Sequence, residues 1–191
     1  MTGICHKKAR KAFLTKFKGN PETLGNKAFH YISGQIVTMI KVLFVCHGNI
    51  CRSTMAQSMF QDMVNKKGLK DKFFIDSAAT SREEIGNGPH YGTVHKLREV
   101  GIPVIPHRAR QMTRSDYDDY DYLIGMDSYN VSNMSRILGG DPDKKIFQML
   151  EFAGLNRSIA DPWYTDNFDE TYNDLLIGLD AFWRYLSERG I

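Results

Sequence analysis

From residue 39 onward, short apolar runs alternate with longer segments whose apolar residues have helical spacing. Residues 40–45 read IKVLFV, an apolar run of strand length that is rich in β-branched residues. Residues 52–67 follow, with Met55, Met59 and Met63 four positions apart, which places them on one helix face. The pattern predicts a buried strand that leads directly into a helix with a methionine stripe in the core.

The same alternation continues to the C-terminus. Three further strands are predicted, over residues 72–78, 120–126 and 144–150. Three further helices are predicted: one through Val94, Leu97 and Val100 that ends at Gly101, one over 127–138 that begins at Asp127 or Ser128 and ends at Gly139, and one over 168–189. The inner face of the last helix is predicted to carry Tyr172, Leu175, Leu176, Leu179, Phe182, Trp183 and Leu186.

Alternating strands and helices predict an α/β fold with a four-stranded parallel sheet and helices on both faces. Right-handed crossovers would place the loops that follow the strands at one edge of this sheet. The segments 46–53, 77–87, 127–130 and the residues after 150 all fall there. Ligands of such sheets bind at that edge, outside the carboxyl ends of the strands.

Charge divides the chain into two parts. Residues 1–38 carry seven Lys/Arg and one Glu, a net charge of +6. Because the whole chain has a net charge of +3, residues 39–191 have a net charge of −3. We therefore predict a basic N-terminal extension over 1–38, poorly ordered or partly helical, and a separate folded domain over 39–191. The extension is predicted to be a solvated leader, with contact to nucleic acid or to an anionic membrane as the alternative for a basic tail. For the protein as a whole, no nucleic-acid partner is expected.

Composition narrows the class of protein. The chain has 191 residues, 42% of them hydrophobic and 25% charged, as is typical of a soluble globular domain. No apolar run approaches the length of a membrane span, and the N-terminus lacks the apolar core of a secretory signal. A cytoplasmic location is expected, and the oligomeric state is left open.

The three cysteines, Cys5, Cys46 and Cys51, provide no disulfide framework, and no two of them form a CxxC pair. His47 is the one histidine close to Cys46 and Cys51, which is too few ligands for a zinc site. The sequence therefore predicts no metal site.

The loop 46–53 has the composition of an anion site. Cys46 ends the first strand, and the backbone N–H groups of residues 47–52 precede the positive end of a helix. Gly48 and Asn49 both tolerate a tight or left-handed turn, and Arg52 offers a planar fork for two phosphate oxygens. A thiol in this field ionises easily, Ser53 can donate to it, and a thiolate beneath a phosphate is a nucleophile. The alternative is an inert buried thiol.

Several motifs occur in an order that resembles one family. VLFVCHGNICRSTMAQ, IDSAATS, GIPVIPHRARQMT, YDYLIGMD and IADPWY are similar to stretches of the low-molecular-weight protein tyrosine phosphatases, over about residues 40–189. The resemblance implies a flavodoxin-like four-stranded sheet and hydrolysis of phosphotyrosine in proteins, or of small aryl phosphates, through a phosphocysteine intermediate. It implies no metal or cofactor.

The resemblance also assigns roles to residues. Cys46 would be the nucleophile, Arg52 would bind the phosphate, and Asp161 would protonate the leaving oxygen. The remaining phosphate-binding loop would consist of His47, Gly48, Asn49, Ile50, Cys51 and Ser53. Taken alone, the Asp161-Pro162 pair is as readily a turn.

Further positions match supporting roles in the family. Asn49, Ser53, Ser77 and His107 would form a hydrogen-bond network behind the loop, although His107 alone reads as a structural histidine. Asp127 would position Arg52, or simply cap a helix. Cys51 would pair with Cys46 under oxidation, or only pack.

The rim of the site would be formed by Trp163 and Tyr164 on one side, with core packing as the alternative for Trp163. Opposite them, Glu83 stands where many family members carry an aromatic residue. An acid there would repel acidic phosphopeptides, unless it belongs to a solvated loop.

Two other functions are compatible with parts of the pattern. A thioredoxin-coupled arsenate reductase shares this scaffold but needs two more cysteines after the third strand, and residues 126–138 contain none. A non-catalytic phosphate-binding module would not need Asp161 opposite Cys46.

Overall fold

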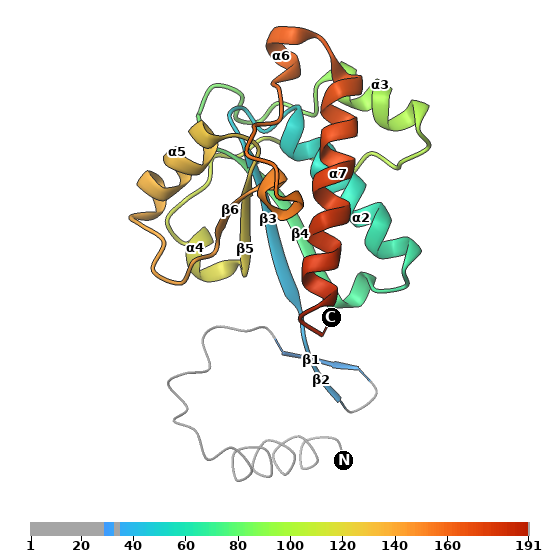
Figure 1. The fold of residues 1–191 in the computed structure, drawn as a ribbon, viewed down its shortest axis with the longest axis vertical. Coiled ribbons are helices and arrows are strands. Elements are labelled where there is room, and N and C mark those ends of the chain that lie inside the picture. The colour runs from blue at the N-terminus through green and yellow to red at the C-terminus, as the bar shows by residue number, and fades with distance from the viewer. Residues whose placement is uncertain (1–28, 33–34, 191) are drawn as a thin grey trace.

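The structure, a computed structural model, describes residues 29–32 and 35–190. Its main sheet has four strands in the order β4-β3-β5-β6, and every neighbouring pair is parallel. The strands are β3 (Ile40–Cys46), β4 (Phe73–Ala79), β5 (Tyr122–Gly125) and β6 (Ile146–Gln148). This confirms the α/β fold class, and Figure 1 shows helices on both sides of the sheet.

Helices separate the strands along the chain, and further helices follow the last strand. The α-helices are α2 (Arg52–Lys66), α3 (Tyr91–Glu99), α4 (Asp116–Asp119), α5 (Ser128–Leu138), α6 (Pro162–Thr165) and α7 (Phe168–Ser187), and the 3-10 helices are η2 (Lys70–Lys72) and η3 (Met149–Ala153). In Figure 1, α4 and α5 lie to the left of the sheet, and α2, α3 and α7 lie to the right.

The alternation of side chains along β3 divides the core in two. Val42 and Phe44 belong to a cluster that includes residues of α2 and α7, whereas Leu43 and Val45 belong to a second cluster with residues of α4 and α5. All four side chains are fully buried. A central parallel strand covered on both faces reads as a continuous apolar run, which is why IKVLFV predicts it well.

The register of β3 and β4 sets the position of the site. Cys46, the last residue of β3, pairs with Ala79, the last residue of β4. The ladder continues one step beyond both strands, since Thr80 N–H donates to Cys46 O and Ser81 N–H donates to His47 O. The chain adds β4 on one side of β3 and then crosses over to add β5 and β6 on the other side. The loop after β3 therefore opens at the point where the strand order reverses, which is where ligands of such sheets bind.

The fourth strand is shorter than predicted. Residues 144–150 were expected to be extended, but β6 ends at Gln148 and Met149 begins η3. Met149 is fully buried against α7, where Gly178 allows the approach: a Cβ at Gly178 would lie 2.5 Å from Met149 Cγ. Apolar character alone does not separate a buried strand from a buried turn.

The helix predictions hold with small changes. Asp127 caps α5 by accepting from Asn130 N–H, and Gly139 ends it with a φ of 83°. The last helix ends at Ser187 rather than at 189, and Leu176 is 40% exposed, so its assignment to the inner face was wrong.

The predicted extension over residues 1–38 contains two strands that the pattern does not predict. β1 (Phe29–Ile32) and β2 (Gln35–Thr38) form an antiparallel pair of their own. Residues 1–28, including Cys5, lie outside the described residues, so the predicted domain boundary stays a prediction. Within the described residues, no helix is long and apolar enough to cross a membrane, and no three potential ligand residues come together around a metal position.

Candidate active site

The loop between β3 and α2 wraps around the Cys46 sulfur. Asn49 takes the left-handed conformation, with a φ of 60°, and its backbone N–H lies 3.3 Å from Cys46 Sγ. Gly48, also expected to permit a left-handed turn, does not have a positive φ. A Cβ at Gly48 would lie 3.1 Å from Glu84 Cγ, so the absence of a side chain gives the Glu84 side chain room.

A hydrogen-bond network supports the loop from behind. The Asn49 side-chain amide donates to Ser53 Oγ (3.0 Å) and to Ser77 Oγ (2.9 Å). Ser77 Oγ donates to Gln57 Oε1 (2.7 Å), while Ser53 Oγ lies 3.1 Å from Cys46 Sγ. Because Ser53 accepts from Asn49, its own proton is available to the sulfur.

The direction of this network follows from one fixed donor. The Arg110 backbone N–H can only donate, and its partner is Asn49 Oδ1 at 3.1 Å. The second contact of that oxygen, His107 Nε2 at 2.7 Å, must therefore also be a donor. Burial lowers the pKa of His107, which favours a neutral ring, and the contact with Asn49 Oδ1 assigns its proton to Nε2.

Arg52 is held between two carboxylates at the carboxyl edge of the sheet. Its Nη1 donates to Asp127 Oδ2 (2.6 Å) and to Ile159 O (3.1 Å), and its Nη2 donates to Asp161 Oδ2. The residue is only 3% exposed, and its Nε has no partner among the described residues. Asp127 thus both caps α5 and orients Arg52, so the two interpretations of this residue hold together.

The two cysteines of the loop differ in character. Burial, followed by the negative charges of Cys46 and Asp161, raises the pKa of Cys51 to about 12. Burial alone would lower the pKa of the Arg52 guanidinium, but Cys46, Asp161 and Asp127 together raise it. Cys51 therefore stays a thiol at neutral pH beside an arginine that stays charged, and both cysteines are free.

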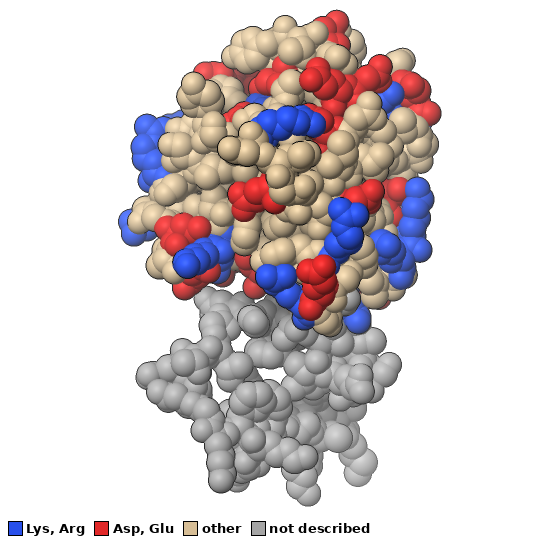
Figure 2. All heavy atoms as spheres, in the orientation of Figure 1, with Lys and Arg blue, Asp and Glu red and all other residues tan. Residues whose placement is uncertain are grey.

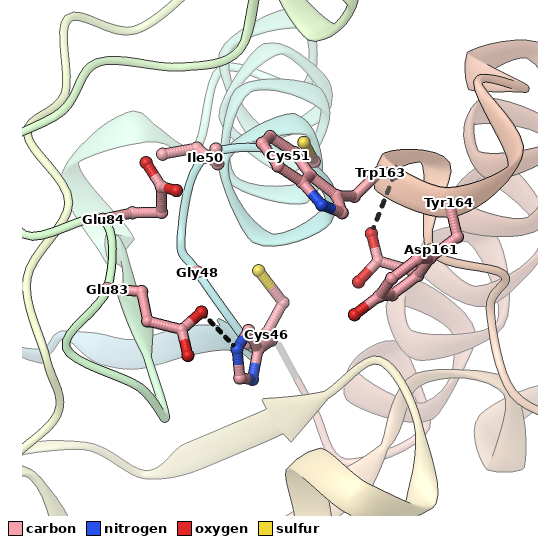
Figure 3. Close-up of a pocket in the computed structure, with 10 residues that line it drawn as sticks. Cys46, Gly48, Ile50, Cys51, Glu83, Glu84, Asp161, Trp163 and Tyr164 are labelled. Atoms are coloured by element: carbon pink, nitrogen blue, oxygen red, sulfur yellow. Dashed lines mark hydrogen bonds and ion pairs between the residues drawn. The ribbon is translucent and has the colours of Figure 1, made fainter.

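Asp161 belongs to the segment that follows β6, an edge strand of the sheet, and η3. It caps the short helix α6 by accepting from Trp163 N–H at 3.2 Å, and Pro162 occupies the first position of that helix. Its carboxyl group lines the same pocket as Cys46, and Figure 3 shows the two side chains across the pocket from one another. The structure thus brings together a thiol and an acid that are 115 positions apart in the chain.

Two walls flank this pocket. Trp163 and Tyr164 form one wall and are 57% and 83% exposed, so the alternative of core packing for Trp163 was wrong. Glu83 and Glu84 form the other wall, and Glu83 Oε2 pairs with His47 Nε2 at 3.0 Å (Figure 3).

Some of the predicted loop residues reach the pocket and others do not. His47, Gly48, Ile50 and Cys51 line it, while Asn49, Ser53, Ser77 and His107 lie behind it. Glu84 was not among the predicted site residues. The close approach of Gly48 to Glu84 draws it into the wall, and its place directly after Glu83 was the available signal.

The chemistry of this pocket is suited to a phosphate ester. A sulfur with two hydrogen-bond donors and a carboxyl group face one cavity, and the buried guanidinium of Arg52 contacts that carboxyl group. The donors stabilise a thiolate, the cation balances phosphate oxygens, and the carboxyl group can deliver a proton to a leaving group.

Comparison with known proteins points in the same direction. The family model for low molecular weight phosphotyrosine protein phosphatases matches residues 41–189. The low molecular weight protein-tyrosine-phosphatase YfkJ of Bacillus subtilis is 43% identical over 134 residues, which cover 69% of this chain and 86% of that protein. A low molecular weight phosphotyrosine protein phosphatase of Schizosaccharomyces pombe is 39% identical over 142 residues, 72% of this chain and 90% of that protein.

A solved structure shows the same likeness in three dimensions. The crystal structure of YfkJ from Bacillus subtilis matches with a TM-score of 0.77 at 38% sequence identity. The match covers 81% of this chain and 98% of that chain.

Proposed function

This chain belongs to the low molecular weight phosphotyrosine protein phosphatase family, and we propose that Cys46, Arg52 and Asp161 carry out its reaction. That reaction is the hydrolysis of phosphotyrosine through a phosphocysteine intermediate. The observation that carries the assignment is the pocket shared by Cys46, the last residue of β3, and Asp161, which comes after β6 and η3.

In the first step, the Cys46 thiolate attacks phosphorus. A sulfur–phosphorus bond forms while the bond from phosphorus to the tyrosyl oxygen breaks. Asp161 gives its proton to that oxygen, because a tyrosinate leaves slowly at neutral pH without one. The Arg52 guanidinium and the loop N–H groups balance the charge on the three equatorial oxygens, and the unpartnered Arg52 Nε supplies one further donor.

In the second step, water attacks the phosphorus of the phosphocysteine. Asp161, now a carboxylate, accepts a proton from the water, and the phosphorus–sulfur bond breaks to release phosphate and the thiolate. The Ser53 hydroxyl, 3.1 Å from the sulfur, stabilises the charge that returns to it.

Asp161 and a bound phosphate share one partner. Arg52 Nη2 contacts Asp161 in the structure, and phosphate oxygens would compete for the same guanidinium. We infer that substrate binding loosens the contact of Arg52 with Asp161 and leaves the carboxyl group able to carry the proton.

The walls of the pocket favour particular substrates. Trp163 and Tyr164 offer exposed aromatic faces to the phenol ring. The opposite wall carries Glu83 and Glu84, and Figure 2 shows further acidic side chains near α6 and the start of α7. We propose that the substrates are phosphotyrosyl proteins whose phosphorylation sites lack acidic neighbours.

The setting of the enzyme is also part of the proposal. The free thiols of Cys46 and Cys51 suit a reducing compartment, which supports a cytoplasmic location. No nucleic-acid partner, metal or cofactor enters the reaction as proposed.

The decisive experiment measures hydrolysis of p-nitrophenyl phosphate in the presence of a chelator. Cys46→Ser should abolish turnover, while Cys5→Ser, which removes a thiol outside the described residues, should retain it. Turnover that survives Cys46→Ser, or that requires a divalent cation, would exclude the thiolate mechanism. Phosphotyrosyl peptides with Lys or Glu beside the phosphotyrosine then test the acidic wall: kcat/KM should be higher for the Lys peptide, and the ratio should shrink with added salt.

A further inference from the structure

The position of the Asp161 carboxyl group depends on a segment that has no regular secondary structure. Residues 155–161 join η3 to α6 without belonging to a helix or strand. No ladder of backbone hydrogen bonds fixes these residues, so contacts with neighbouring elements decide where Asp161 lies.

The end of this segment nearest Asp161 is anchored in the core beside the catalytic arginine. Ile159 is 1% exposed, and its N–H donates to Met126 O at 2.9 Å. Its carbonyl accepts from Arg52 Nη1 at 3.1 Å. Ile159, two residues before Asp161, therefore holds the segment against β5's C-terminal loop at Met126 and against Arg52.

The other anchor is an ion pair with the last helix. Arg157 donates from both Nη atoms to the two carboxylate oxygens of Asp174, each at 2.6 Å. The Asp174 side chain is 7% exposed, whereas that of Arg157 is 48% exposed. Gln148 Nε2 also donates to Arg157 O at 2.9 Å, so backbone and side chain of Arg157 are both held.

One face of α7 contacts this segment at two positions. Thr171 and Asp174 are three positions apart and so lie on the same side of the helix. Thr171 Oγ1 donates to Ala160 O at 3.3 Å, while Asp174 holds Arg157. The helix thus contacts the segment at residues 157 and 160, immediately before Asp161.

We propose that Arg157 and Asp174 are positioning residues for the proton donor: their paired contact sets the distance and angle at which Asp161 meets the leaving oxygen. The inference rests on the role proposed above for Asp161. A bidentate pair fixes orientation as well as distance, which a single hydrogen bond does not. A displacement of about 1 Å in a catalytic group can cost about 100-fold in rate, so a modest shift of the segment is measurable.

The test uses leaving groups, because a misplaced acid matters most when the leaving oxygen needs its proton. Asp174→Asn removes the charge of the pair while keeping the shape of the side chain. Asp62→Asn is the matched control, since Asp62 forms a comparable helix-borne ion pair with Lys66 at 2.6 Å, on α2. For each variant, kcat/KM is measured with phenyl phosphate, a poor leaving group, and with p-nitrophenyl phosphate, a good one.

Asp174→Asn should lower kcat/KM for phenyl phosphate about tenfold more than for p-nitrophenyl phosphate. Asp62→Asn should leave that ratio unchanged. In the double variant Asp174→Asn/Asp161→Asn, the ratio should equal that of Asp161→Asn alone, since there is no longer an acid to position. If Asp174→Asn gives no folded protein, Arg157→Lys, which keeps the charge and loses the fork, should move the ratio in the same direction.

The outcomes separate this inference from the proposed function. An equal loss on both substrates, or a lower melting temperature with an unchanged ratio, would show that the pair only stabilises the fold and would overturn the inference. If Asp161→Asn itself leaves the ratio unchanged, the assignment of the proton donor fails and the positioning role fails with it.

Discussion

Ser53→Ala should slow the second chemical step more than the first. Ser53 is fully buried and makes two contacts through its hydroxyl, one to Cys46 Sγ at 3.1 Å and one from Asn49 Nδ2 at 3.0 Å. Negative charge leaves the sulfur as it attacks phosphorus and returns to it as phosphate departs. A hydrogen bond to the sulfur therefore contributes most when the thiolate is the leaving group.

The size of the effect follows from that contact. A hydrogen bond to a charged group contributes about 1.5–3 kcal/mol. At about 1.4 kcal/mol for each factor of ten, loss of the Ser53 hydroxyl should lower kcat about 10- to 100-fold. The fold should lose only about 1 kcal/mol, because the Asn49 amide keeps its bond to Ser77 Oγ at 2.9 Å.

The assay combines steady-state turnover with a rapid-quench measurement of the phosphoenzyme. In Ser53→Ala, kcat should fall by more than kcat/KM, and phosphocysteine should accumulate. Ser58→Ala is the control, since Ser58 is a buried serine of the same helix whose hydroxyl accepts from Ile105 N–H, away from the sulfur. Equal decreases in kcat and kcat/KM, without accumulation of phosphoenzyme, would refute the reasoning.

Three further outcomes are expected. Because burial raises the pKa of Cys51 to about 12, iodoacetate at neutral pH should alkylate Cys46 and leave Cys51 unmodified; peptide mapping that finds both labelled at equal rates would contradict this. Gly178→Ala should destabilise the protein by about 1–3 kcal/mol in urea unfolding, because the new Cβ would lie 2.5 Å from Met149 Cγ; an unchanged midpoint would show that η3 can move away. Burial lowers the pKa of His107 from 6.5, so the unfolded state binds the extra proton and stability falls as pH drops through and below about 6.5. His107→Gln should flatten that fall between about pH 7.5 and about pH 5.5, and an equal slope in both proteins would assign it to other groups.

The sequence predicted the elements whose signal is local. The strand over residues 40–45 and its following helix were found because a strand buried on both faces leaves an uninterrupted apolar run, and the observed β3 extends one residue further, to Cys46. The predicted helix end at Gly139 was equally local, because a left-handed residue there favours glycine. The approach of Cys46, Arg52 and Asp161 was predicted from motif order, and the structure brings their side chains to the same site.

The remaining features depend on contacts between segments that are distant in the chain. Nothing near Gly48 indicates that Glu84 would pack against it, and nothing near Met149 indicates that Gly178 would admit it. The pair of Arg157 and Asp174 joins an irregular segment to a helix, so it has no period to recognise.

The three-way contact of Arg52 has a consequence for the newly made chain. Its partners Asp127 and Asp161 lie 75 and 109 positions further along, so the site cannot assemble until residue 161 has left the ribosome. A nascent chain that already displays Cys46 and its loop would still lack the arginine clamp and the acid. Truncated products of interrupted translation should therefore have no phosphatase activity towards phosphoproteins.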